Sequence, residues 1–238
     1  MKRIWTALRR RIPVPLKRGY RASRRRLAHP RLSLVARRRR SELRHALQEF
    51  RARDEGAPIP EDLLRRLFHG WGNERYAARP EYLRAVIDAA DRARGPILEC
   101  GCGLSTLLLG IEGSRRGVAV CALEHDAYWA KRTRRELAQN EIENAVVVDA
   151  PLRDYGDFVW YEIPRALPES FSLVVCDGPP ADRGGRYGLV PLLADRIEGA
   201  EILLDDATRS QEEEVISRWT REYGIISKLD GTFARLST

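Results

Sequence analysis

Five short apolar segments follow one another through this 238-residue chain, and a carboxylate side chain comes directly after each of them. The segments are residues 97–98, 118–123, 145–148, 171–176 and 202–204. Polar or helical stretches separate them, and this alternation is typical of buried parallel strands joined by crossover helices. Because parallel strands bind ligands beyond their carboxyl ends, we expect the five acids to gather along one edge of a sheet.

The predicted fold class is therefore α/β. Two more strand candidates, residues 225–229 and 232–236, close the chain, and helical periodicity is present over residues 63–68, 80–93 and 210–223. We predict a Rossmann-like, doubly wound, mostly parallel seven-stranded sheet with flanking helices. A hydrophobic content of 43% over this length is enough for one substantial core.

Positive charge is concentrated in the first part of the chain. Residues 1–53 hold 19 Lys and Arg against Glu42 and Glu49, a local balance of +17, which leaves −9 for the remainder of a chain whose net charge is +8. We place a domain boundary at residue 53, between a basic, helical or disordered N-terminal arm (1–53) and a catalytic-sized domain (54–238).

Three roles for this arm stay open: a solvated extension, a contact for nucleic acid or another polyanion, and a membrane-surface or targeting segment. The sequence has no long apolar run and no signal-peptide pattern, so a cytoplasmic location is expected, with a mitochondrial or membrane-associated one as the alternative. The four cysteines form no CxxC pair, which argues against a zinc site and a disulfide framework.

The first of the five acids precedes a glycine-rich loop, Glu99-Cys100-Gly101-Cys102-Gly103. Glycines at the end of a strand let the backbone approach a ligand, and the next helix presents its amino terminus there. Glu99 would repel a dinucleotide pyrophosphate, and Thr106 stands where the GxGxxG fingerprint needs its third glycine. The loop therefore suits a ligand with a cationic or hydroxylated group, although it could also be a purely structural turn.

The second and third acids have spacings that suit a nucleoside. Glu124 lies 21 residues past Gly103, a position from which a carboxylate can hold two ribose hydroxyls, and Asp149 could accept a hydrogen bond from an exocyclic amine. The alternative for any one of these acids is a helix cap, and Asp126, Asp177 and Asp206 are the candidates for that role. Caps do not require glutamate, so the ordered series favours a ligand site.

The chain resembles the class I S-adenosylmethionine-dependent methyltransferases from about residue 71 to its end. The resemblance rests on Glu99-x-Gly101-x-Gly103-x-Ser105-Thr106, Glu124, Asp149-Ala150 and Asp177-Gly178-Pro179, in this order. It implies that the loop Glu99, Gly101, Cys102, Gly103, Ser105 and Thr106 holds the methionine part of the cofactor, with Glu99 at its amino group. It further implies that Glu124 holds the ribose, Asp149 and Ala150 the adenine, and His125 the ribose or adenine edge.

The fourth and fifth acids bear on the methyl acceptor. The sequence Asp177-Gly178-Pro179-Pro180 departs from the Asn/Asp-Pro-Pro-aromatic motif of amino-group methyltransferases. Asp177, Asp205 and Asp206 instead resemble the magnesium triad of catechol-type and macrocin-type O-methyltransferases, and carboxylate oxygens suit that hard cation. The alternative is that Asp177 orients the substrate or acts catalytically while Asp205 or Asp206 caps the helix near Ser210.

Residues around this site leave further options. Residues 71–76 could form a lid or a plain loop, and Arg183, Arg186 and Arg209 could receive an acidic acceptor or be solvated. We expect an S-adenosylmethionine-dependent enzyme that methylates oxygen on a small molecule or saccharide. An RNA methyltransferase that uses the arm to hold nucleic acid is the second hypothesis, and a cofactor-binding or scaffold protein is the third.

Overall fold

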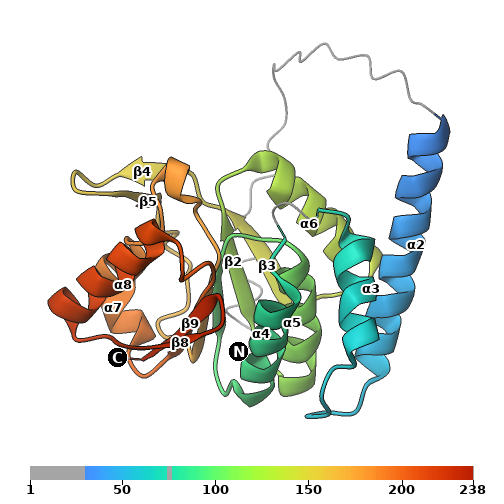
Figure 1. Cartoon of the computed structure of the whole chain (residues 1–238), viewed down its shortest axis with the longest axis horizontal. Coiled ribbons are helices and arrows are strands. Elements are labelled where there is room, and N and C mark those ends of the chain that lie inside the picture. Colours follow the sequence, from blue (N-terminus) through green and yellow to red (C-terminus); the bar gives the residue numbers. More distant parts are fainter. Residues whose placement is uncertain (1–29, 74–76, 238) are drawn as a thin grey trace.

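A seven-stranded sheet forms the centre of the protein (Figure 1). The computed structural model describes residues 30–73 and 77–237. The strand order is β3-β2-β1-β6-β7-β9-β8, and all neighbours are parallel except β9, which is antiparallel to both β7 and β8. The strands are β1 (Ile97–Cys100), β2 (Val120–Glu124), β3 (Ala145–Asp149), β6 (Leu173–Cys176), β7 (Glu201–Leu204), β8 (Ile226–Asp230) and β9 (Phe233–Ser237). The predicted fold class is confirmed.

Helices cover both faces of this sheet. One face packs against α4 (Pro80–Arg92), α5 (Leu104–Arg116) and α6 (Ala127–Gln139), with α2 (Pro30–Ala52) and α3 (Glu61–Trp71) outside them. The other packs against α7 (Leu189–Ile197) and α8 (Ser210–Tyr223), and a short 3-10 helix, η1 (Ala181–Arg183), follows β6. Apart from β8, the strands of this sheet are mostly buried, and their inward side chains alternate between two hydrophobic clusters, one on each face. In the described part of the chain, no helix combines the length and the apolar content that a bilayer span needs.

A two-stranded hairpin was not foreseen from the sequence. Strands β4 (Leu152–Asp154) and β5 (Val159–Tyr161) pair antiparallel after β3, apart from the main sheet. The aromatic residues of β5 are fully buried: Trp160 and Tyr161 pack with the apolar cluster of α7 and α8. The hairpin therefore closes one side of the space above the sheet.

The second half of the basic arm is part of the folded core. Helix α2 buries Leu43, Leu47 and Phe50 in the same cluster as α3, α4 and α5. A methyl group on Gly70 of α3 would lie 2.7 Å from the backbone nitrogen of Leu43, so the two helices touch closely. The boundary predicted at residue 53 thus separates two segments that share one core, and the expectation of a solvated arm does not hold for this part. Residues 1–29 lie outside the described residues.

An ion cluster fixes the carboxyl end of α2 against α5. The Glu112 side chain is completely buried, and its Oε1 receives Nη2 of Arg53 at 2.7 Å and Nη1 of Arg115 at 2.9 Å. Arg115 Nη2 also donates to the carbonyl oxygens of Phe50, Arg51 and Arg53. A cation at a helix carboxyl terminus satisfies free carbonyl groups and the helix dipole, so Glu112 and Arg115 lock α2 in place.

These contacts predict that α2 is required for stability. Leu47→Ala removes a side chain that is 2% exposed and should lower the free energy of unfolding by about 2–5 kcal/mol, the usual range for such a cavity. Leu34→Ala makes the same change on the same helix where the side chain is 57% exposed, and should alter it by less than about 0.5 kcal/mol. Urea unfolding of both variants provides the measurement. Equal midpoints would mean that α2 does not pack on the domain in solution.

Candidate functional site

A cavity of about 500 Å³ opens at the carboxyl ends of the parallel strands. This volume lies within the range of small-molecule sites. Of the residues predicted for the site, ten line the cavity: Glu99, Gly101, Cys102, Gly103, Ser105, Glu124, His125, Asp177, Asp205 and Asp206. Trp71 and Asn73 of the predicted lid line it too, whereas residues 74–76 lie outside the described residues.

Two glycines bring the loops after β1 and β6 into contact. Gly101 has φ +92°, a conformation that side chains disfavour, and a methyl group there would lie 3.5 Å from the nitrogen of Gly178. A methyl group on Gly178 would lie 2.6 Å from the Tyr161 hydroxyl. Gly178 favours glycine because real Cβ atoms do not approach other atoms as closely as 2.6 Å, and Gly101 favours it because of its positive φ, so the backbone itself lines the cavity here.

Glu99 lies beneath the glycine loop and is buried. Its Oε2 accepts a hydrogen bond from Thr106 Oγ1 at 2.6 Å, and the same hydroxyl accepts one from the Gly103 nitrogen at 2.9 Å. Thr106 therefore shapes the loop from behind rather than lining the cavity. Burial raises the pKa of Glu99 to about 8, against the lowering effect of hydrogen bonds from Ser105 and Thr106. Its Oε1 is buried and has no hydrogen-bond partner.

Glu124 connects the end of β2 with the glycine loop. Its Oε2 accepts from the Cys102 nitrogen at 3.1 Å, and its Oε1 accepts from the Asp126 nitrogen at 2.7 Å. A carboxylate can accept about four hydrogen bonds, so both oxygens keep capacity for a ligand. His125 Nδ1 lies 3.2 Å from Glu124 Oε1 but makes no hydrogen bond. Asp126 caps α6 by accepting from the nitrogens of Tyr128 and Trp129, as expected for an acid in this position.

Asp149 and Ala150 are not brought into this cavity. The Asp149 side chain is 55% exposed and pairs with Arg134 at 2.8 Å, and Ala150 is buried against the opposite cluster. The cavity extends instead toward Trp71 and Trp129, whose rings lie 4.2 Å and 5.2 Å from the guanidinium of Arg132. The adenine role of Asp149 and Ala150 therefore stays a prediction without geometric support.

Two of the lining aromatic residues had no clear signal in the sequence. Tyr161 is fully buried, and its hydroxyl has no hydrogen-bond partner. It comes from the unforeseen hairpin, so only its position after the third strand pointed to the site. Trp129 is the third residue of α6. From the sequence alone, an aromatic residue in a helix cannot be told from one that packs in the core.

A buried arginine occupies the centre of the acidic cluster above β6 and β7. Arg186 is 2% exposed, and its Nη2 lies 3.2 Å from Asp177 Oδ1 and 3.3 Å from Asp206 Oδ2. Its Nη1 donates to Glu212 Oε1 at 2.9 Å and to the Asp205 carbonyl at 2.7 Å. The sequence had suggested that Arg186 either receives an acidic acceptor or is solvated. The structure shows neither, because Arg186 is buried and paired with acids of the protein itself. A guanidinium suits this place because its several N–H donors can reach different acceptors at once.

The acids around Arg186 are electrostatically strained. Burial raises the pKa of Asp177 well above its usual value, and Asp205 raises it further, while Arg186 acts in the opposite sense. Burial and then Asp206 raise the pKa of Asp205 to about 6. Asp206 itself has φ +55°, which is uncommon for a residue other than glycine. Its carboxylate binds Arg186 and Arg209, and α8 begins at Ser210 without a side-chain cap, so the capping alternative is wrong.

The same geometry bears on the predicted magnesium triad. One carboxylate oxygen from each of Asp177, Asp205 and Asp206 lies within 4.8 Å of the others, which is compatible with a shared cation. However, Arg186 already contacts two of these three side chains, and Asp205 Oδ1 accepts from the Asp206 nitrogen at 2.8 Å. A divalent ion would therefore share its ligands with a buried guanidinium. The residues do not fit magnesium while Arg186 is in this position.

The arrangement can now be compared with known proteins. No protein-family model matches the sequence, and no curated protein matches it. Among solved structures, the SAH-bound methyltransferase PaMTH1 of Podospora anserina is similar, with a TM-score of 0.56 and 13% identity over 94% of this chain and 99% of that chain. The fold is that of the class I methyltransferases.

A second similar structure has the same fold. Cofactor-bound Rv0187 from MTB matches with a TM-score of 0.50 and 20% identity, over 68% of this chain and 82% of that chain. The PaMTH1 match spans nearly all of both chains, so the predicted methyltransferase resemblance is confirmed at the level of the fold. At these identities, neither structure assigns a substrate to this chain.

The Arg186 contacts predict how the protein responds to divalent ions. Arg186→Met should lower the free energy of unfolding by about 3–5 kcal/mol, because it leaves buried acids without their counter-charge. Magnesium should then raise the melting temperature of this variant and leave that of the unchanged protein where it is. Differential scanning fluorimetry with and without magnesium measures both. Arg209→Met is the matched control. Arg209 also binds Asp206, but its side chain is 60% exposed, so this variant should have the same melting temperature as the unchanged protein, with and without magnesium.

A magnesium-dependent rise in the melting temperature of the unchanged protein would contradict this account. It would mean that the ion displaces Arg186, and the predicted triad would then be restored.

Proposed function

We propose that the protein is an S-adenosylmethionine-dependent methyltransferase. The observation that carries the proposal is a set of buried polar atoms without hydrogen-bond partners on residues that line the cavity: Glu99 Oε1, His125 Nδ1 and Tyr161 Oη. Leaving a buried polar group unsatisfied costs about 1–3 kcal/mol, so such atoms favour a polar ligand. The methyltransferase fold and the ordered acids identify the ligand that we propose.

The residues present fit the methionine and ribose parts of this cofactor. Glu99 offers a buried, unpartnered carboxylate oxygen to an ammonium group, and the glycine loop lets a ligand approach the backbone. Glu124 keeps acceptor capacity for two hydroxyls. When bound, the cofactor supplies a methyl group on a cationic sulfur. The acids lining the cavity favour that charge.

For the acceptor, we propose a hydroxyl group of a small molecule or saccharide. Asp177 lines the cavity beyond the glycine loop, and its raised pKa suits a group that takes a proton from a hydroxyl as the new bond to carbon forms. We assign that role to Asp177 without magnesium, because Arg186 already neutralises part of the cluster. A cavity of about 500 Å³ favours a small acceptor over an extended one.

Cofactor binding should depend on pH through Glu99. The pKa of Glu99 near 8 means that the carboxyl is mostly protonated at neutral pH, and an ammonium group favours its ionised form. Binding of S-adenosylhomocysteine should therefore release close to one proton at pH 7, and the affinity should rise about tenfold per unit as pH increases from 6 toward 8. Titration calorimetry in two buffers of different ionisation enthalpy measures the proton release.

Glu99→Gln provides the control for this effect. The variant keeps the shape of the side chain but cannot ionise, so both the proton release and the pH dependence should disappear while weaker binding persists. If the unchanged protein binds without releasing a proton, Glu99 does not contact the amino group. If it does not bind the cofactor at all, the proposed function is wrong.

Turnover should depend on Asp177. Asp177→Asn retains hydrogen bonding but removes the proton acceptor, so kcat should fall about 10²–10⁴-fold while cofactor affinity changes little. Methyl transfer from labelled cofactor to panels of small hydroxyl compounds, saccharides and total RNA is the assay. Activity toward RNA alone would replace the proposed acceptor with the second hypothesis. Loss of cofactor binding in the variant would assign Asp177 to the cofactor instead.

A further inference from the structure

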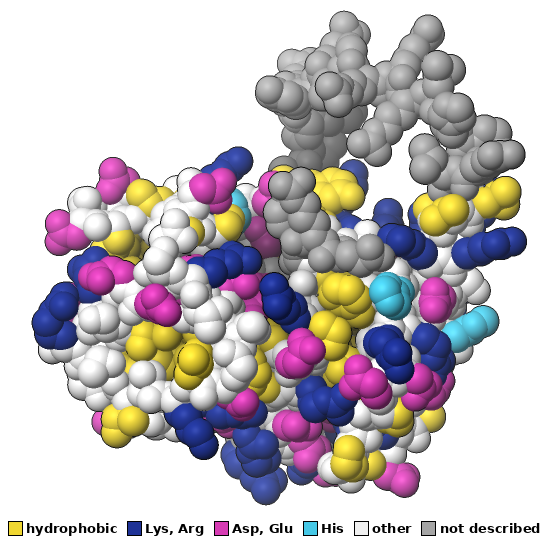
Figure 2. Space-filling model, viewed as in Figure 1, with side chains coloured by type: hydrophobic (Ala, Val, Ile, Leu, Met, Phe, Trp, Pro, Cys, Tyr) yellow, Lys and Arg dark blue, Asp and Glu magenta, His cyan; other side chains and the backbone are white. Residues whose placement is uncertain are grey.

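We propose that one flank of helix α2 is a binding surface for the phosphate backbone of RNA. The surface, called the arginine flank here, consists of Arg37, Arg40, Arg44 and Arg51. Their spacings of three, four and seven residues place them along one side of an α-helix. All four side chains are exposed. Figure 2 shows basic side chains gathered around the upper part of α2.

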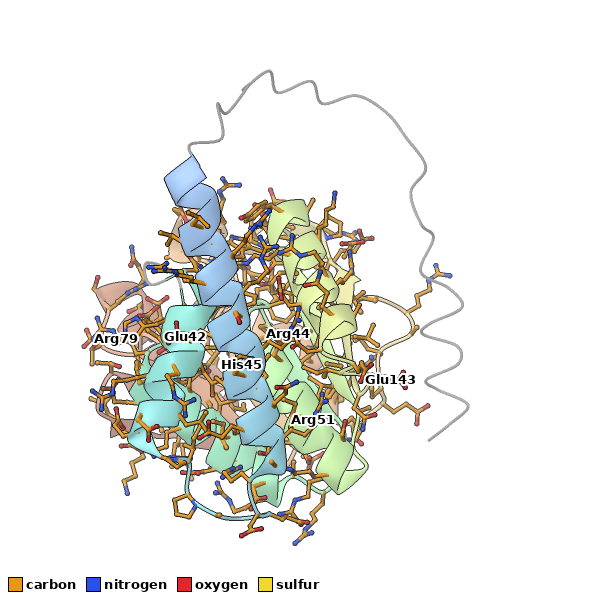
Figure 3. The ribbon with its side chains drawn as sticks, turned by 90° about the vertical axis from the view of Figure 1, so that its right-hand side faces the viewer. Glu42, Arg44, His45, Arg51, Arg79 and Glu143 are labelled. Carbon is orange, nitrogen blue, oxygen red and sulfur yellow. The ribbon has the colours of Figure 1, made fainter. Side chains whose placement is uncertain are left out.

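The two acids of α2 lie on a different side of the helix from the arginine flank. Figure 3 shows Arg44 and Arg51 on one side of the helix and Glu42 on the other. The second acid of the helix, Glu49, follows Glu42 by two turns and binds Arg66 of α3 at 2.7 Å, so the acids lie on the α3 side. Arg51 Nη2 donates to the Asn140 carbonyl at the end of α6 at 2.7 Å, which turns the arginine flank toward α6. The flank therefore contains cations without an acid between them.

The arginine flank places several exposed, unpaired arginines along one side of a helix. Some exposed or half-exposed arginines elsewhere pair with acids, as Arg84 does with Glu61 at 2.5 Å and Arg92 with Glu201 at 2.9 Å. Others, such as Arg65 and Arg94, are exposed without an ion pair among the described residues, but they are not part of such a row. In the described part of the chain, none of the four arginines of the flank forms an ion pair with Asp or Glu. Unpaired like charges repel one another, so an external polyanion is the partner that would stabilise them.

The dimensions of the flank suit a chain of phosphates. With a rise of 1.5 Å per residue, the four arginines follow one another at about 4.5, 6 and 10.5 Å along roughly 21 Å of helix. Guanidinium groups bind phosphate oxygens through two parallel hydrogen bonds. Several such contacts release counterions together, which makes binding strong at low salt and steeply salt-dependent.

The buried face of α2 favours RNA over a membrane surface. A helix that lies on a bilayer inserts its apolar face, but Leu43, Ala46, Leu47 and Phe50 are already buried in the protein core. The arginines alone would then have to hold the membrane. An RNA strand needs only the cations, and it can follow them along the helix. This inference does not depend on the proposed methyl transfer.

The test compares two charge-matched variants of the full chain. The flank variant carries Arg37→Gln, Arg40→Gln and Arg44→Gln, and the control carries Arg65→Gln, Arg94→Gln and Arg165→Gln, which are exposed elsewhere. Binding to a fluorescein-labelled single-stranded RNA is followed by anisotropy across a salt series. The flank variant should bind at least about tenfold more weakly, and its slope of log affinity against log salt should be smaller by about two, since each lost contact to a single strand contributes about 0.7.

The control variant should bind RNA within about twofold of the unchanged protein, and all three proteins should have the same melting temperature because the substituted side chains are exposed. Equal losses in the two variants would overturn the proposal, because net charge alone would then explain them. An unchanged affinity in the flank variant would overturn it as well. Binding to phosphatidylserine vesicles but not to RNA would replace RNA with a membrane surface.

Discussion

The guanidinium of Arg186 holds together the end of the sheet above β6 and β7. It is buried among Asp177, Asp206 and Glu212. It also donates hydrogen bonds to two backbone carbonyl oxygens, those of Asp177 and Asp205. Without this cation, carboxylates that lie within a few ångströms of one another would repel or take up protons. The shape of the cavity beside β6 and β7 therefore depends on one side chain. Because that side chain comes from the loop before α7, the loop is held to the two strand ends as well.

The presence of Arg186 also limits the chemistry that the acidic cluster above β6 and β7 can support. A metal ion can exchange and can bind a substrate oxygen directly, whereas a guanidinium stays in place and offers only hydrogen bonds. With Arg186 in the cluster, the acids form a fixed arrangement whose net charge is smaller than three carboxylates would give. Asp177 then keeps a basic oxygen at the cavity while its other contacts are taken by Arg186.

The sequence predicted the sheet well, and most of the acids and glycines that it assigned to a ligand site line the cavity, because both depend on local patterns. Each strand end is marked by an apolar run followed by an acid, and parallel pairing brings those ends together whatever the loops do. Asp149 was predicted at the cavity on the same basis, but it pairs with Arg134 of the preceding helix, and no strand pattern encodes that contact. Arg186 was missed as a structural cation because its partners come from three separate segments.

The arm shows a different limit of sequence analysis. Its average composition is strongly basic, so the few apolar residues of α2 looked insufficient for a core of their own. They do not form one: Leu43, Leu47 and Phe50 complete the core of the domain instead. The cavity-lining hairpin was missed for a similar reason, because its strands have three residues each and their pairing partner is not predictable from so short a pattern.

Helix α2 is attached to the domain through its carboxyl half. Its carboxyl end is fixed by Glu112 and Arg115, and among its described side chains, from residue 34 on, the first buried one is Leu43. About 13 residues, or roughly 20 Å of helix, precede that point and rise beside the body of the protein (Figure 1). A helix is stiff, so the packed carboxyl half fixes the direction of the part before it. The positive charge of Arg37 and Arg40 is thereby held at a set place beside the body of the protein rather than on a loose tail.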